Sequence, residues 1–132
     1  MKKAGIIVAL AHRCQAQSVN TSIGIKTKEI NEIVEKTIIE NGGYPSFKGL
    51  YGFPAAACIS VNSVIVHGIP DNTVLKDGDI VSVDIGACYK GYHGDSAWTY
   101  AVGNVDEQTK RLMYIGEKSL YEGLKWQRSG II

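Results

Sequence analysis

The sequence predicts an α+β fold in which helices flank an antiparallel sheet. Two N-terminal segments and one C-terminal segment carry apolar residues three and four positions apart, the spacing of an amphipathic helix. Between them lie short apolar segments, the clearest of which alternates apolar and polar residues like a strand. Runs of strands with helices outside them are typical of an antiparallel sheet. With 132 residues, 45% of them hydrophobic, we expect a single domain over residues 1–132.

The first two predicted helices cover residues 2–19 and residues 28–41. The expected buried stripe of the first consists of Ile6, Ile7, Leu10, Ala11 and Cys14. The stripe of the second consists of Ile30, Ile33, Val34, Thr37 and Ile38. Thr27 is expected to be the N-cap of the second helix, because its side-chain oxygen can accept hydrogen bonds from free backbone amides, and Gly42 and Gly43 are expected to end it.

An ordered loop with aromatic side chains is expected at residues 44–54, and strands come after it. The predicted strands are residues 56–61, 64–68, 79–88 and 92–102. In the third of them, Val81, Val83 and Ile85 point to one face of the sheet, whereas Asp84 points to the other, more open face.

The turn between the last two strands decides where Asp84 and Asp95 lie relative to each other. A two-residue turn at Lys90–Gly91 pairs residue 84 with 97 and residue 86 with 95, so the two aspartates become diagonal neighbours on one face. A turn at Tyr89–Lys90 would place them directly opposite each other, and an unbulged three-residue loop would separate them onto two faces.

The last predicted helix runs from about Glu107 to Gln127, with Asp106 as its N-cap. Its apolar side is expected to consist of Leu112, Ile115, Leu120 and Leu124.

Charge and cysteine content exclude several kinds of partner. The formal net charge is +1, which gives no strong field to attract nucleic acid or anionic lipid, and no segment is apolar enough over about 18 residues to cross a membrane. The 3 cysteines are widely spaced and odd in number, so we expect reduced thiols and a cytoplasmic protein.

Asp84 and Asp95 are candidate metal ligands. Facing like charges destabilise a sheet, and a divalent cation between them is the simplest compensation. A site dominated by oxygen ligands with some imidazole suits Mn, Fe, Co or Zn. The alternative is that Asp84 caps a turn while Asp95 is solvated. His67 comes after an apolar segment and enters a Gly-Pro turn, where its side chain can project into a cleft.

Six segments together resemble the first half of type I methionine aminopeptidases, in the order of that family and over nearly the whole chain. They are Pro45–Gly49, Tyr51–Pro54, Ser60–Asn62, Val66–Pro70, Leu75–Val81 and Gly91–Ser96. The resemblance implies the pita-bread fold, in which two related halves enclose a site with two metal ions. It also implies an activity, the removal of N-terminal methionine from nascent polypeptides, with the peptide N-terminus as substrate.

The resemblance also implies roles for individual residues. Asp84 looks like the aspartate that binds one metal ion through both oxygens, and Asp95 like the aspartate that bridges both ions. His67 matches a catalytic histidine that contacts the substrate, and Phe53 and Cys58 match residues of the methionine pocket.

Beyond Asp95 the sequence departs from the family. The other metal ligands of the family, one histidine and two glutamates, belong to a C-terminal half that this sequence lacks, so we expect a truncated relative with two of five ligands. We therefore expect weak or absent metal binding and little activity of the monomer, unless a second copy or another partner chain completes the site. The alternatives are a noncatalytic peptide- or protein-binding module on the same half fold and the inactive product of an interrupted gene.

Overall fold

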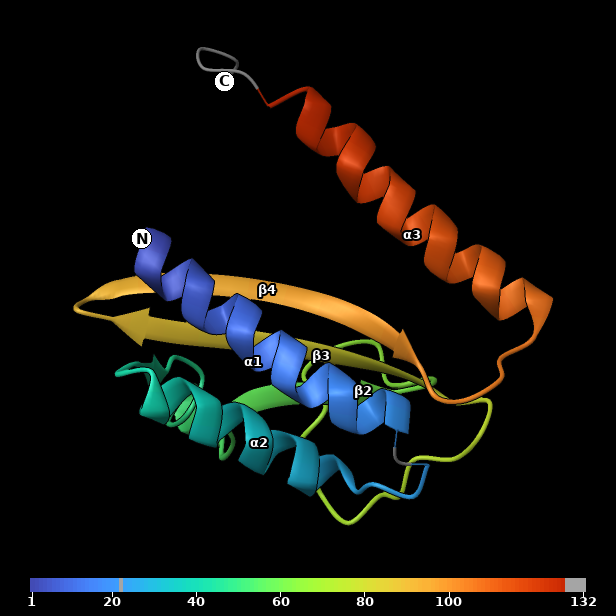
Figure 1. Ribbon diagram of the computed structural model, residues 1–132, viewed down its shortest axis with the longest axis horizontal. Helices are drawn as coiled ribbons and strands as arrows, with labels where there is room; N and C mark the ends of the chain where they lie inside the picture. Colours follow the sequence, from blue (N-terminus) through green and yellow to red (C-terminus); the bar gives the residue numbers. More distant parts are fainter. Residues whose placement is uncertain (22, 128–132) are drawn as a thin grey trace.

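The computed structural model describes residues 1–21 and 23–127, and it has the predicted α+β architecture (Figure 1). In chain order its elements are α1 (Lys2–Thr21), α2 (Thr27–Glu40), β1 (Tyr44–Pro45), the 3-10 helix η1 (Leu50–Gly52), β2 (Ala57–Val61), β3 (Ile80–Tyr89), β4 (Tyr92–Ala101) and α3 (Glu107–Lys125). Helices α1 and α2 lie side by side across one face of the sheet, whereas α3 stands apart beyond β4.

The sheet is antiparallel and is organised around β3. On one side β3 pairs with β4 along its whole length, and on the other side it pairs with β1 near its end and with β2 near its start. Lys90 and Gly91 form the turn, and both have positive φ. The resulting register pairs Asp84 with Ala97 and Gly86 with Asp95, as the two-residue turn predicts.

The hydrophobic core lies between this sheet and the two N-terminal helices. Val81, Val83 and Ile85 of β3 are fully buried against the helices, as their alternation predicts. Ile30, Val34 and Ile38 of α2 are buried as well. The opposite face of the sheet therefore stays available for polar side chains.

Helix α1 buries a stripe next to the predicted one. Ile7 and Ala11 are buried as expected, but Ile6 is 42% exposed and Cys14 is exposed. Their places are taken by Ala4, Val8, Gln15 and Val19. Both stripes have helical spacing, so periodicity alone could not choose between them.

The prediction of Thr27 as N-cap is wrong by one residue, because Lys26 caps α2 and Thr27 is the first helical residue. The Lys26 N–H donates to the Glu29 carboxylate at 2.7 Å. The Thr27 hydroxyl donates to the Asp71 carbonyl at 3.1 Å and accepts from the Asp71 N–H at 2.9 Å. Tertiary contact with a distant loop thus uses the hydroxyl that would otherwise cap the helix.

The predicted strand at residues 64–68 does not form. This segment is irregular and exposed, with Ile65 86% exposed. It is fastened beside β2 by two hydrogen bonds, from Ile59 N–H to Gly68 C=O at 2.8 Å and from Gly68 N–H to Ser60 Oγ at 3.1 Å. Its apolar residues find no neighbouring layer among the described residues, so the burial that favours a strand is missing.

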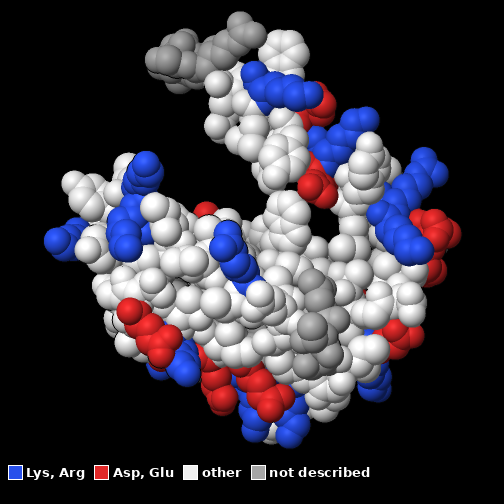
Figure 2. All heavy atoms as spheres, viewed as in Figure 1, with Lys and Arg blue, Asp and Glu red and all other residues white. Residues whose placement is uncertain are grey.

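Helix α3 begins as predicted, since the Asp106 carboxylate accepts from the Thr109 N–H at 2.7 Å. None of its residues is buried. Its predicted apolar side, Leu112, Ile115, Leu120 and Leu124, is 46% to 64% exposed. Figure 2 shows basic and acidic side chains intermixed along α3 and over the rest of the visible face. No described helix is long and apolar enough to cross a membrane.

Candidate metal centre

All five predicted site residues line one cavity of about 510 Å³. Asp84 and Asp95 come from the open face of the sheet, Cys58 from β2, His67 from the irregular segment after β2, and Phe53 from the loop before it. Residues that are far apart in sequence are therefore brought to one place by the β3–β4 pairing and the two loops.

The two aspartates share a face because of the hairpin register. Gly86 lies directly opposite Asp95, two residues after Asp84. A Cβ at Gly86 would be 2.6 Å from the Phe47 ring, so only glycine lets this ring lie on the sheet beside the carboxylates. Phe47 also lines the cavity; the sequence placed it in the aromatic loop but did not single it out as a site residue.

The surroundings of Asp84 in the cavity disfavour its charged form. Burial and the nearby Asp95 carboxylate raise its pKa to about 6, and the His67 ring lowers it in part. Its Oδ1 atom is buried and has no hydrogen-bond partner among the described residues. A buried carboxylate oxygen without a partner is costly, and a bound cation would remove that cost.

Cys58 is held as a neutral thiol. Burial, followed by the charges of Asp84 and Asp95, raises its pKa to about 11. The thiolate is the nucleophilic form of cysteine, so this side chain acts as a small apolar wall of the cavity and not as a nucleophile.

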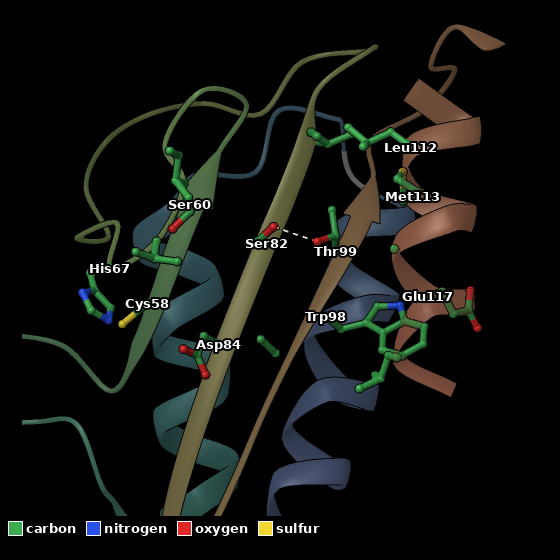
Figure 3. A pocket seen from close by; sticks show the side chains of 16 residues that line it. Cys58, Ser60, His67, Ser82, Asp84, Trp98, Thr99, Leu112, Met113 and Glu117 are labelled. Carbon is green, nitrogen blue, oxygen red and sulfur yellow. Dashed lines mark hydrogen bonds between the residues drawn. The ribbon is translucent and has the colours of Figure 1, made fainter. Parts of the chain in front are cut away.

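His67 is exposed and lies in the left-handed region, with φ 57°. Its position depends on Gly68, where a Cβ would be 2.2 Å from the Ile59 carbonyl oxygen. The backbone after His67 is thus pressed against β2, which points the imidazole into the cavity region near Cys58 and Asp84 (Figure 3).

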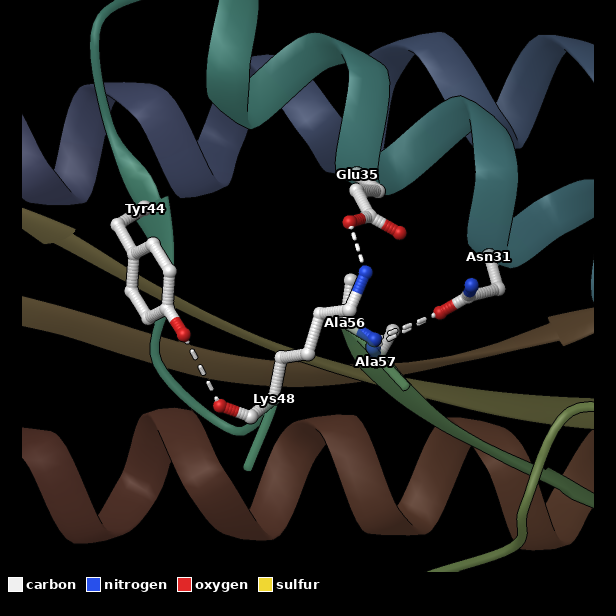
Figure 4. Close-up of polar contacts among 6 residues, drawn as sticks. All are labelled: Asn31, Glu35, Tyr44, Lys48, Ala56 and Ala57. Carbon is white, nitrogen blue, oxygen red and sulfur yellow. Dashed lines mark hydrogen bonds and ion pairs between the residues drawn. The ribbon is translucent and has the colours of Figure 1, made fainter. Parts of the chain in front are cut away.

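The aromatic loop is attached to α2 by polar contacts (Figure 4). Asn31 Oδ1 accepts from the N–H groups of Ala56 and Ala57 at 2.9 and 3.1 Å. Lys48 forms an ion pair with Glu35, and its carbonyl accepts from the Tyr44 hydroxyl at 3.2 Å. These contacts position the loop that contributes Phe47 and Phe53 to the cavity. Because they join distant parts of the chain, periodicity could not predict them.

A second cavity of about 550 Å³ lies between the open sheet face and α3 (Figure 3). It shares Cys58, His67 and Asp84 with the first cavity, and Leu112 and Met113 of α3 form part of its wall. The sequence predicted the apolar side of α3 but not that it would face this space.

The described residues supply an incomplete metal site. Among them, no group of three or more histidine, cysteine, aspartate and glutamate side chains is placed to hold a metal ion. Asp84 and Asp95 offer the hard oxygen donors that suit a divalent cation, and the partnerless oxygen of Asp84 fits one. Two carboxylates nevertheless leave most positions around such an ion to other ligands.

The sequence matches the family model described as metallopeptidase family M24 over residues 1–132. It is 52% identical to methionine aminopeptidase 1 of Bacillus subtilis, over 98% of this chain and 52% of that protein. It is 46% identical to the methionine aminopeptidase of Clostridium perfringens, over 95% of this chain and 49% of that protein.

Solved structures agree with these sequence matches. Methionine aminopeptidase from Thermotoga maritima superposes with a TM-score of 0.95 at 40% identity, over 99% of this chain and 52% of that chain. Aminopeptidase P of Escherichia coli, with a TM-score of 0.83 at 24% identity, shares the fold. The chain thus spans about half the length of the methionine aminopeptidases of Bacillus subtilis, Clostridium perfringens and Thermotoga maritima.

Proposed function

The chain belongs to metallopeptidase family M24, and on that premise we propose that it forms half of a methionine aminopeptidase site, which removes N-terminal methionine from polypeptides. The observation that carries the proposal is the pair Asp84 and Asp95 on one sheet face, in a cavity where an oxygen of Asp84 has no described partner. Free cysteines support a cytoplasmic location as part of the proposal.

Membership in a metallopeptidase family implies a divalent metal cofactor. We assign its binding to Asp84 and Asp95, with Mn, Fe, Co or Zn as the candidate ions and two ions as the full complement. When bound, such ions lower the pKa of a water molecule and polarise the scissile carbonyl. The raised pKa of Asp84 means that metal and proton compete for this carboxylate near pH 6.

Two residues of the cavity offer apolar surface for the first side chain of a peptide. Phe53 is half-buried, Cys58 is a neutral thiol, and both lie beside the two carboxylates. We propose that Phe53 and Cys58 contact the methionine side chain. His67, at the edge of the same cavity, orients the scissile amide by hydrogen bonding.

We propose that polypeptide outside residues 1–132 completes the site, and a second copy or a partner chain is a candidate for it. Three observations on the described residues support this: they offer two candidate ligands, Asp84 and Asp95, the apolar side of α3 is exposed, and β4 pairs with β3 alone. Unpaired strand edges and large exposed apolar surfaces are both sites of association.

The alternative function is a noncatalytic peptide-binding module. A preformed cavity of about 510 Å³ with few metal ligands favours it, because a peptide terminus can bind there without hydrolysis.

Calorimetric titration with Mn²⁺ separates the two functions. We expect the wild-type chain to bind Mn²⁺ weakly and Asp95→Ala to lose this binding. Glu40→Gln, which alters an exposed carboxylate on α2, should retain it. Hydrolysis of Met-Gly is expected only with metal and a completed site. Binding of a Met-peptide that chelators leave unchanged, without Mn²⁺ binding, would favour the noncatalytic module.

A further inference from the structure

Asp95 lies on the edge strand β4, so the position of its carboxylate depends on how firmly that strand is held. Within the described part of the chain, β4 pairs with β3 on one side only, and Asp95 itself is exposed. Edge strands lack the second row of hydrogen bonds that fixes a central strand. A metal ligand must nevertheless be held to within about 0.5 Å, so something else has to fix this part of β4.

The residue before Asp95 is held by direct backbone packing. A Cβ at Gly94 would be 2.7 Å from the Ala4 carbonyl carbon and 2.7 Å from the Gly5 nitrogen. The first turn of α1 therefore rests on the backbone of β4 at this position, and any larger residue would push the two elements apart.

The residue after Asp95 is held by His12, in the middle of α1. His12 Nε2 lies 3.0 Å from the Ser96 carbonyl oxygen, and His12 Nδ1 lies 3.0 Å from the Tyr100 hydroxyl. A carbonyl only accepts, so Nε2 carries the proton and Nδ1 accepts from Tyr100. Burial lowers the pKa of His12, which keeps the ring in this neutral form.

We infer that α1 positions the Asp95 carboxylate by bracing β4 on both sides of it, through the Gly94 contact and the His12–Ser96 hydrogen bond. His12 is thus a positioning residue, acting through the backbone of Ser96. The inference rests on the proposed function, because that function gives Asp95 its role as a metal ligand. The contacts of α1 with β4 do not themselves require metal.

Two substitutions of His12 test whether α1 holds β4 in place. His12→Phe keeps an aromatic ring but removes both hydrogen bonds, and His12→Gln keeps a donor that can reach Ser96. Amide hydrogen exchange, measured by NMR without metal, should become about fivefold faster in His12→Phe at Gly94 and Ser96, whose N–H groups face β3, as for the loss of one hydrogen bond. His12→Gln should restore most of the protection. Arg13→Gln, on the exposed neighbouring position of α1, is the matched control and should change nothing.

Local and global effects are distinguished within the same experiment. Amides of β2, such as Ile59, should keep their exchange rates, whereas simple destabilisation of the fold would accelerate them too. Gly94→Ala gives an independent check, since it should accelerate exchange at the Ser96 amide without changing His12. Unchanged exchange at Ser96 in both His12→Phe and Gly94→Ala, or acceleration that His12→Gln does not reverse, would overturn the inference.

Titration with Mn²⁺ separates this inference from the proposed function. If Asp95 binds metal, His12→Phe should weaken Mn²⁺ binding about tenfold and His12→Gln should restore it, as for other groups that orient a ligand. If the wild-type chain bound no Mn²⁺ but the variants showed the expected exchange rates, the metal site would be refuted, whereas the inference that α1 holds β4 in place would stand. Normal Mn²⁺ affinity in His12→Phe would refute a positioning role.

Discussion

Asp84→Asn should make the metal-free chain more stable at neutral pH. In the folded chain, burial and the Asp95 charge raise the pKa of Asp84 to about 6 from an ordinary value of 3.8. The difference of about 2 pKa units corresponds to a loss of about 3 kcal/mol in the free energy of unfolding, before solvent screening is taken into account. Asp84 is half-buried, so solvent screening reduces this to about 1–2 kcal/mol. Asparagine keeps the shape of the side chain and carries no charge, so it removes this cost.

The pH dependence has a defined sign. Because the folded chain holds the Asp84 proton more tightly than the unfolded chain, wild-type stability falls as pH rises from about 4 to about 6 and is lowest, on this account, above pH 6. The advantage of Asp84→Asn should therefore be near zero at pH 4 and complete by pH 7.5. Urea unfolding followed by circular dichroism, with EDTA present, measures it at both pH values.

Saturating Mn²⁺ should make the wild type more stable than Asp84→Asn. A cation that binds only the folded wild type stabilises it according to its concentration relative to Kd, and Asp84→Asn should gain far less. Glu40→Gln serves as the control and should differ from wild type by less than about 0.5 kcal/mol at either pH. An Asp84→Asn variant no more stable than wild type at pH 7.5, or equally stabilised at pH 4, would refute the electrostatic reasoning.

Three further predictions concern packing and reactivity. Gly68→Ala should lower the free energy of unfolding by more than about 2 kcal/mol, because its Cβ would be 2.2 Å from a backbone oxygen. Gly116→Ala in α3 has open space around the new Cβ and should raise the free energy of unfolding by about 0.5–1 kcal/mol. Urea unfolding of both variants checks this. Iodoacetamide at pH 8 should modify exposed Cys14 well before Cys58, whose pKa is raised to about 11, and peptide mass spectrometry gives the order. Leu112→Glu should change the stability of the monomer by less than about 0.5 kcal/mol, because Leu112 is 64% exposed; a larger loss in thermal unfolding would mean that α3 packs on the chain itself.

The β3–β4 hairpin shows how much of the structure can be predicted from local sequence pattern. Alternation in β3 predicts which face each side chain of that strand occupies. Of the turns that the sequence allowed, the structure has the one at Lys90–Gly91, which makes Asp84 and Asp95 diagonal neighbours on one face. The same kind of reasoning was wrong for residues 64–68, where an apolar segment has no layer to pack against. It also could not choose the buried stripe of α1, since neighbouring stripes have the same period.

The sequence by itself determined the fold class, a small set of hairpin registers and the candidate ligands Asp84 and Asp95, because these depend on periodicity and on residues close together along the chain. Only the tertiary structure decided that Phe47 lies on Gly86, that His12 reaches Ser96 and that α3 remains unpacked. These features join residues far apart in sequence through contacts of a few ångströms. Such contacts depend on how whole elements pack, and a one-dimensional pattern does not contain that information.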